Sequence, residues 1–166
     1  QTGVKKIFND DAFAEKLAEA GCRLSSANSI NIGRLIPQVA YYVYGYAKLA
    51  ERGAIKTGDP INVVVPTGNF GNILAAYYAK QMGVPIDKLI CASNKNKVLT
   101  DFINTGVYNI DREFYLTNSP SMDILISSNL ERLLYHLAGN DGDKVKELMD
   151  ALDSKKSYAI DERIKS

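Results

Sequence analysis

Glycine and asparagine are concentrated in residues 67–72, which read Thr67-Gly68-Asn69-Phe70-Gly71-Asn72 and separate an apolar run from a segment with helical spacing. Two glycines allow a tight turn in which backbone N–H groups can close around a ligand. The start of a helix adds N–H groups that have no intrahelical partner and about half a positive charge. This combination binds phosphate groups, and the side chains of Thr67, Asn69 and Asn72 could supply further donors.

The spacing of this loop argues against two common nucleotide-binding motifs. No lysine follows the second glycine, as the G-x-x-x-x-G-K-[ST] motif requires. The loop also departs from G-x-G-x-x-G, and no acid about 20 residues further on lies clearly at the end of a second strand. An ordinary turn with helix-capping asparagines is an alternative, because turns favour Gly and Asn for backbone reasons alone. The position after a strand favours ligand binding, since open α/β sheets bind ligands at the carboxyl ends of their strands.

The segments around the loop alternate between strand and helix patterns. The β-branched run at 61–65 is typical of a buried strand, and apolar residues recur at helical spacing over 73–82. Residues 88–93 predict the next strand, and residues 98–103 predict a helix that stops at Gly106. This order predicts an α/β fold in which helices flank a parallel sheet.

Other helices are expected on both sides of this core. Residues 11–20 and 143–152 predict short helices, and residues 32–50 predict a long amphipathic one. Pro37 interrupts the long pattern and predicts a kink, or a helix that begins later than Ile32, because a proline inside a helix costs about 3 kcal/mol. An apolar stripe over 122–137 predicts a further buried helix.

Composition and charge exclude several classes of function. The chain is 46% hydrophobic and 23% charged, as is usual for a compact globular domain. Its net charge of +1 gives no field that would attract a nucleic acid or an anionic membrane surface, so we expect neither as a partner. No apolar run reaches the roughly 18 residues of a membrane span. Two cysteines and one histidine are too few for a disulfide framework or a His-based metal site, so we expect a reduced, cytoplasmic setting and no metal.

Three segments of the chain carry a resemblance to a known family. They are Pro66-Thr67-Gly68-Asn69-Phe70-Gly71-Asn72, then Ser26-Ala27-Asn28-Ser29-Ile30-Asn31-Ile32-Gly33-Arg34 with the following Gln38 and Tyr41-Tyr42, and finally Ser119-Pro120-Ser121-Met122-Asp123-Ile124 with the following Ser128-Asn129-Leu130-Glu131-Arg132-Leu133. Together they resemble the threonine synthases, a branch of the fold-type II pyridoxal 5'-phosphate (PLP) enzymes, and the first is similar to the phosphate-binding loop of that family. The segments follow the family's order over most of the chain. The resemblance therefore implies an incomplete fold-type II PLP enzyme core.

This resemblance also implies an activity and a set of site residues. Threonine synthases are PLP-dependent and convert O-phospho-L-homoserine and water to L-threonine and phosphate. By matching position, the cofactor phosphate would be held, mainly through backbone N–H groups, by Gly68, Asn69, Phe70, Gly71 and Asn72. The side chain of Phe70 is better explained by packing. The substrate's anionic groups would be faced by Asn28, Ser29, Asn31 and Arg34, for which helix capping and a solvated position are the alternatives.

The catalytic lysine of this family is the feature that the chain lacks. In the family, the Schiff-base lysine lies ahead of the matched motifs in a segment that contains His, Gly and Phe, and no such segment occurs here. We therefore expect residues 1–166 to be an internal fragment of the PLP-dependent catalytic core, inactive alone, whose partner is the remainder of the same polypeptide. Two other functions stay open: a non-catalytic α/β module that binds a phosphate ligand, and a related PLP-dependent dehydratase. Dehydratases usually carry several consecutive glycines in this loop, and the chain does not.

Overall fold

A parallel pair of strands forms the centre of the molecule. The structure is a computed structural model that describes residues 6–161, apart from 9, 26–27 and 29. Strand β1 (Ile61–Pro66) pairs in parallel with β2 (Ile86–Ala92), and α5 (Gly71–Gln81) connects them. The predicted strand, loop and helix are thereby confirmed, as is the α/β class with a parallel sheet.

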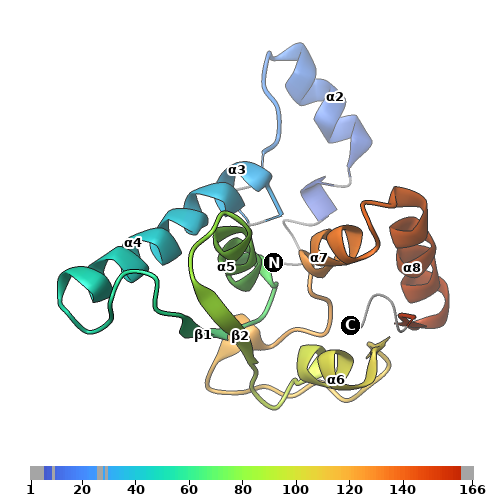
Figure 1. Ribbon diagram of the computed structural model, residues 1–166. Helices are drawn as coiled ribbons and strands as arrows, with labels where there is room; N and C mark the ends of the chain where they lie inside the picture. The colour runs from blue at the N-terminus through green and yellow to red at the C-terminus, as the bar shows by residue number, and fades with distance from the viewer. Residues whose placement is uncertain (1–5, 9, 26–27, 29, 162–166) are drawn as a thin grey trace.

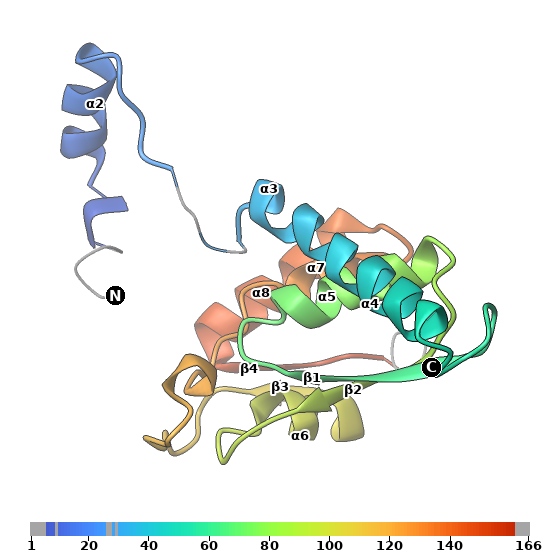
Figure 2. The ribbon, with the colours of Figure 1, turned by 90° about the vertical axis from the view of Figure 1, so that its left-hand side faces the viewer.

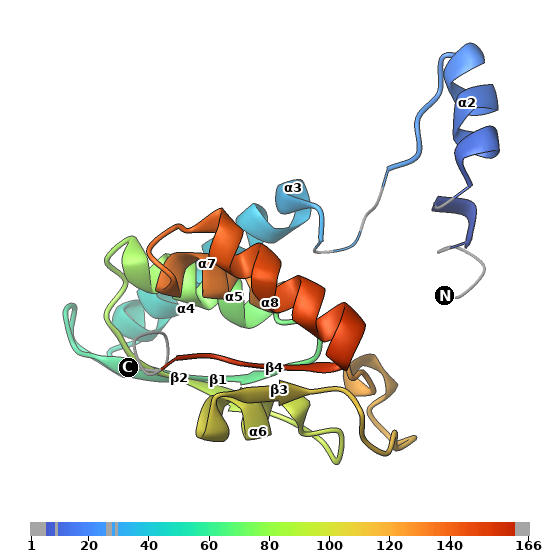
Figure 3. The ribbon, with the colours of Figure 1, turned by 90° about the vertical axis from the view of Figure 1, so that its right-hand side faces the viewer.

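Helices cover the two faces of the strands unequally. The helices α4 (Val39–Glu51), α5, α7 (Leu130–Leu137) and α8 (Gly142–Lys155) lie on one side, whereas α6 (Val98–Thr105) lies on the other (Figures 2 and 3). The core lies beneath α5 and α7, where Leu74 and Leu134 are fully buried. The strand predicted at 61–65 is only partly buried, because Val65 lies in the core whereas Val64 is 60% exposed.

Two short strands form a second, antiparallel sheet. Strand β3 (Val107–Asn109) pairs with β4 (Ser157–Ala159), and the rings of Tyr108 and Tyr158 stack at 5.2 Å with Phe102 edge-on to both. The sequence analysis did not predict these strands, since three residues are too few to show a period of two. The helix preceding them is confirmed, and Gly106 ends it in the left-handed conformation, at φ 76°.

Pro37 divides the long N-terminal helix as predicted. Helix α3 (Ile32–Leu35) passes into the 3-10 helix η1 (Ile36–Gln38) and then into α4. Farther upstream, α2 (Asp11–Glu19) confirms the helix predicted at 11–20; it has no buried residue and stands away from the other elements (Figure 1). None of the helices in the described ranges has the length and apolar character that crossing a bilayer requires.

The helix predicted from the apolar stripe at 122–137 begins later than expected. Only α7 is helical there; the 3-10 helix η2 (Pro120–Met122) and an irregular segment precede it. The carboxylate of Asp123 accepts hydrogen bonds from the side chains of Asn94 and Thr117 and from the Thr117 N–H group. These contacts satisfy Asp123 outside a helix, so its hydrogen bonds to Thr117 and to the distant Asn94 override the apolar spacing. The helix predicted at 143–152 is confirmed by α8.

Candidate phosphate-binding site

The glycine-rich loop leaves the carboxyl end of β1 and enters α5. Its first residue extends the sheet, because the Thr67 N–H group donates to the Ala92 carbonyl at 2.8 Å. The Thr67 hydroxyl donates to the Val65 carbonyl at 2.7 Å and is buried. That hydroxyl hydrogen is therefore directed at the strand, and the expectation that it serves a ligand is wrong in this structure.

Phe70 occupies the N-cap position of α5 in an unusual backbone conformation. Its φ is 65°, in the left-handed region that non-glycine residues seldom adopt, and it provides no side-chain cap. Its ring is buried in the core, as the packing interpretation required. The alternative of a turn capped by asparagine side chains does not fit, because neither Asn69 nor Asn72 caps the helix.

The first turn of α5 consequently presents backbone donors to the adjoining space. The first intrahelical bond runs from the Leu74 N–H group to the Phe70 carbonyl at 3.0 Å. Within the described part of the chain, no acceptor is recorded for the N–H groups of Gly71, Asn72 and Ile73. Successive N–H groups near a left-handed residue and at a helix N-terminus form an anion-binding concavity.

Gly68 lies too close to the neighbouring backbone to be any other residue without a shift. A Cβ atom at this position would lie 2.9 Å from the Ser121 carbonyl oxygen and 3.4 Å from the Met122 Cα atom. The Gly68 carbonyl accepts a hydrogen bond from the Ser127 hydroxyl at 2.9 Å. The loop is thus packed against the segment that begins at η2.

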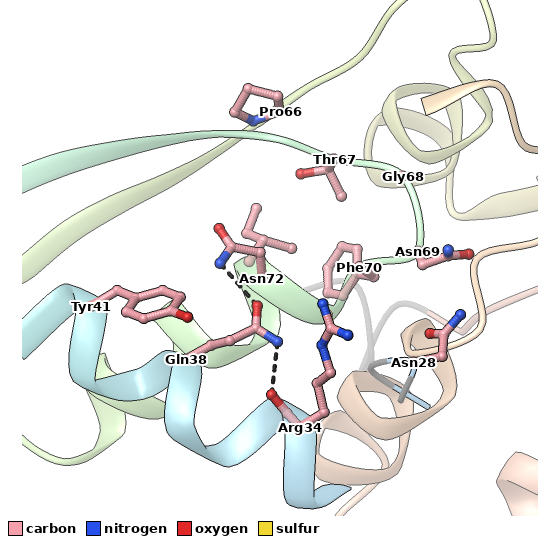
Figure 4. A pocket seen from close by; sticks show the side chains of 12 residues that line it. Asn28, Arg34, Gln38, Tyr41, Pro66, Thr67, Gly68, Asn69, Phe70 and Asn72 are labelled. Carbon is pink, nitrogen blue, oxygen red and sulfur yellow. Dashed lines mark hydrogen bonds between the residues drawn. The ribbon is translucent and has the colours of Figure 1, made fainter. Parts of the chain in front are cut away.

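A pocket of about 640 Å³ opens in front of the loop, a volume suited to a cofactor-sized ligand (Figure 4). Its lining joins the loop to the region around α3, and consists of Asn28, Arg34, Gln38, Tyr41 and residues 66–73. The Arg34 side chain extends from α3 toward the loop in Figure 4. Two segments whose nearest lining residues, Tyr41 and Pro66, are 25 positions apart in the sequence therefore share one pocket.

The four residues expected to face the substrate are placed differently. Asn28 and Arg34 line the pocket. Asn31 caps α3, where its side chain accepts from the Gly33 N–H group at 2.9 Å, and it is not part of the lining. Ser29 lies outside the described residues.

A chain of hydrogen bonds joins the loop to α4. The Gln38 side chain donates to the Arg34 carbonyl at 3.0 Å and accepts from the Asn72 amide at 3.1 Å (Figure 4). The Tyr42 hydroxyl donates to the Asn72 side-chain oxygen at 2.6 Å, and burial raises the pKa of Tyr42 to about 12. The Asn72 side chain is therefore engaged with the helix, which leaves its backbone N–H as the donor that faces the pocket.

The donor set fits an anionic phosphate group. Among the described residues that line the pocket, Arg34 is the only charged one. This lining contains neither a carboxylate nor a lysine. A guanidinium and several backbone N–H groups bind phosphate oxygens well, whereas they repel metal cations. Nowhere in the described ranges do three His, Cys, Asp or Glu side chains gather as a metal site.

Comparisons with known proteins identify the relatives of the chain. No protein-family model matches it. It is 54% identical to human threonine synthase-like 1 over 166 residues, which is 99% of this chain and 22% of that protein. It is 46% identical to threonine synthase of Saccharomyces cerevisiae over 135 residues, covering 81% of this chain and 25% of that one. The crystal structure of PLP-bound threonine synthase from Brucella melitensis superposes with a TM-score of 0.84 at 42% identity, over 98% of this chain and 32% of the other.

The chain has the α/β fold of part of a fold-type II PLP enzyme. Within that class, it is a homologue of a portion of the threonine synthases and the threonine synthase-like 1 proteins. The resemblance inferred from the three sequence segments is thereby confirmed. The chain spans between about a fifth and a third of the length of these relatives.

Proposed function

We propose that the chain is an internal part of the catalytic core of a PLP-dependent threonine synthase, and that loop 66–72 holds the cofactor phosphate. The observation that carries this proposal is the pocket that joins the N–H groups at the start of α5 to Arg34 and Asn28. The relatives support it, because one of the matching structures is a PLP-bound threonine synthase. The cytoplasmic setting expected from two unpaired cysteines belongs to the same proposal.

The proposed roles divide the pocket into two sides. Backbone N–H groups of Gly68, Asn69, Phe70, Gly71 and Asn72 bind the phosphate of PLP, and the α5 dipole adds to their attraction. Bound PLP supplies the electron sink for the conversion of O-phospho-L-homoserine and water to L-threonine and phosphate. Arg34 and Asn28 orient an anionic group of the substrate, and a guanidinium can do so with two parallel hydrogen bonds.

The chemistry of this reaction also needs a lysine that the proposal assigns to the remainder of the polypeptide. No lysine lines the pocket among the described residues. The rival function is therefore a phosphate-binding module without catalysis. Formation of threonine and phosphate from O-phospho-L-homoserine by the full-length polypeptide would separate the two functions, because a module would form neither.

Cofactor binding can be tested on the 166-residue chain with two matched ligands. Pyridoxine 5'-phosphate has no aldehyde and cannot form a Schiff base with surface lysines, and pyridoxine lacks the phosphate as well. We define the phosphate increment as the ratio of the dissociation constants for pyridoxine and pyridoxine 5'-phosphate, measured by titration calorimetry. An increment of about tenfold or more is expected from charge-assisted hydrogen bonds. Equal dissociation constants would refute the assignment of the loop.

A pair of glycine variants provides the control. Gly71→Asp places a carboxylate at the first residue of α5 and is expected to abolish the increment by repelling the phosphate. Gly142→Asp makes the same change at the first residue of α8, where a Cβ atom meets nothing within 4 Å, and should leave the increment unchanged. If the two variants behave alike, the loop is not the phosphate site. In the full-length protein, Gly71→Asp should also remove the Schiff-base absorbance of retained cofactor.

A further inference from the structure

Two residues outside the pocket hold the carbonyl groups of the loop. The Ser127 hydroxyl donates to the Gly68 carbonyl at 2.9 Å. The Asn69 carbonyl accepts two hydrogen bonds from Asn129, one from its backbone N–H at 3.1 Å and one from its side-chain amide at 2.8 Å. Neither Ser127 nor Asn129 lines the pocket. Both loop carbonyls are thus turned toward the protein interior.

The direction of these carbonyls fixes the direction of the next N–H groups. In a planar trans peptide, the C=O of one residue and the N–H of the following residue point in opposite directions. When the Gly68 and Asn69 carbonyls point at Ser127 and Asn129, the N–H groups of Asn69 and Phe70 are directed the other way. They therefore join the N–H groups at the start of α5 on the pocket side of the loop.

Asn129 is itself held in one orientation. It is fully buried, and its side-chain oxygen accepts a hydrogen bond from Nη1 of Arg132 one turn along α7. A buried amide with donor and acceptor both satisfied cannot rotate without losing hydrogen bonds. The orientation of the Asn69 peptide is consequently determined by a rigid side chain.

Arg132 connects this support to the other side of the pocket. Its Nη2 atom donates to the Ile30 carbonyl at 2.5 Å, between Asn28 and Arg34 in the chain. The guanidinium of Arg132 thus contacts Asn129, which supports the phosphate loop, and also the backbone of Ile30, which lies in the segment that carries Asn28 and Arg34. A planar guanidinium fixes the relative position of two acceptors, which a single ammonium group does less well.

We propose that Asn129 is a positioning residue for the phosphate-binding loop. We further propose that Arg132, through the Ile30 carbonyl, holds the backbone between Asn28 and Arg34 at a fixed position relative to that loop. This inference rests on the proposed function, since it concerns the same phosphate site. Asn129 does not touch the ligand; it acts by directing the N–H groups of Asn69 and Phe70 into the pocket. Because Arg132 bonds both Asn129 and the Ile30 carbonyl, it fixes the distance between the two sides of the pocket.

The test compares the phosphate increment of the unchanged chain with those of Asn129→Ala and of a control on the same helix. Leu134→Ala empties a fully buried site in α7 without removing the hydrogen bonds that Asn129 makes to the loop, so it lowers the unfolding temperature while leaving those bonds in place. Asn129→Ala is expected to reduce the increment about tenfold, as the loss of a charge-assisted site predicts. Leu134→Ala should leave the increment within about twofold. The affinity for pyridoxine should change little in either variant.

A second variant keeps the inference testable where Asn129→Ala fails to fold. Arg132→Lys retains the charge on a partly exposed position and loses the two-pronged contact. It should shift the ¹⁵N–¹H signals of both Asn69 and Ile30, and lower the increment by about threefold. An unchanged increment in these variants, with a clear increment in the unchanged chain, would overturn the positioning role alone. An unchanged chain that shows no increment would overturn the positioning role and the proposed function together.

Discussion

Replacing Gly68 by alanine tests how tightly the phosphate loop is packed. The added Cβ atom would lie 2.9 Å from the Ser121 carbonyl oxygen, whereas a carbon–oxygen contact is normally about 3.3 Å or more, so the loop and η2 must separate by about 0.4 Å. Neither side of this contact is a flexible side chain. Overpacking of this kind costs about 1–3 kcal/mol, so Gly68→Ala should lower the free energy of unfolding by that amount.

Urea denaturation of Gly68→Ala and Gly45→Ala provides a matched measurement. Gly45 lies within α4, and a Cβ atom there meets nothing within 4 Å, so alanine should stabilise the chain by roughly 0.5–1 kcal/mol. With a slope of about 2 kcal/mol per M, the midpoint should fall by roughly 0.5–1.5 M for Gly68→Ala and rise for Gly45→Ala. The phosphate increment should also fall by about three- to tenfold in Gly68→Ala alone. A Gly68→Ala protein with unaltered midpoint and increment would show that this reasoning about the contact is wrong.

Three further changes are expected to separate the contacts around the loop. Tyr42→Phe removes the hydroxyl that donates to the Asn72 side chain and should cost about 1 kcal/mol of unfolding free energy in urea. Burial raises the pKa of Tyr42 and of Tyr108 to about 12 from 10.0, so the contribution of these two hydroxyls to stability should be constant below pH 10 and be lost as pH rises through 12. A urea midpoint that stays constant between pH 10 and 12 would contradict the burial of these hydroxyls. Hydrogen bonds, first from the Thr117 N–H group, lower the pKa of Asp123 below 3.8, so its contribution is present above that pH and is lost as pH falls through the lowered pKa. Asp123→Asn should therefore flatten the acid limb of the urea midpoint, and an unchanged limb would count against this network.

The elements next to the loop were predictable because their signals are local. The β-branched run of β1, the helical spacing of α5 and the left-handed glycine that ends α6 each depend on a few neighbouring residues. Pro37 likewise marks its own break, because its missing N–H and its ring act on the turn that contains it. The loop itself belongs to this group, as its glycines limit which backbone conformations are accessible.

Contacts made at long range were not predictable from the same patterns. The stripe at 122–137 has helical spacing, but the hydrogen bonds of Asp123 reach Asn94, which lies 29 residues earlier. Ser127 and Asn129 lie within the same stripe, whose spacing predicts only a buried helix, although both hold the loop. The one signal that could have indicated Asn129 is a short polar residue at the start of an otherwise apolar stripe, where a buried amide needs a partner.

The phosphate binding that we propose for this loop therefore depends on the tertiary structure. The glycines and the start of α5 provide N–H groups, but many turns between a strand and a helix do the same. What distinguishes this turn is that its carbonyls are bonded to side chains about 60 residues away in the sequence, at Ser127 and Asn129. Those bonds exist only when α7 is packed against α5, and Arg132 extends them to the segment that bears Arg34. The same sequence of glycines and asparagines, taken out of that packing, would leave its N–H groups without a fixed direction and would lose most of the preference for phosphate that we propose.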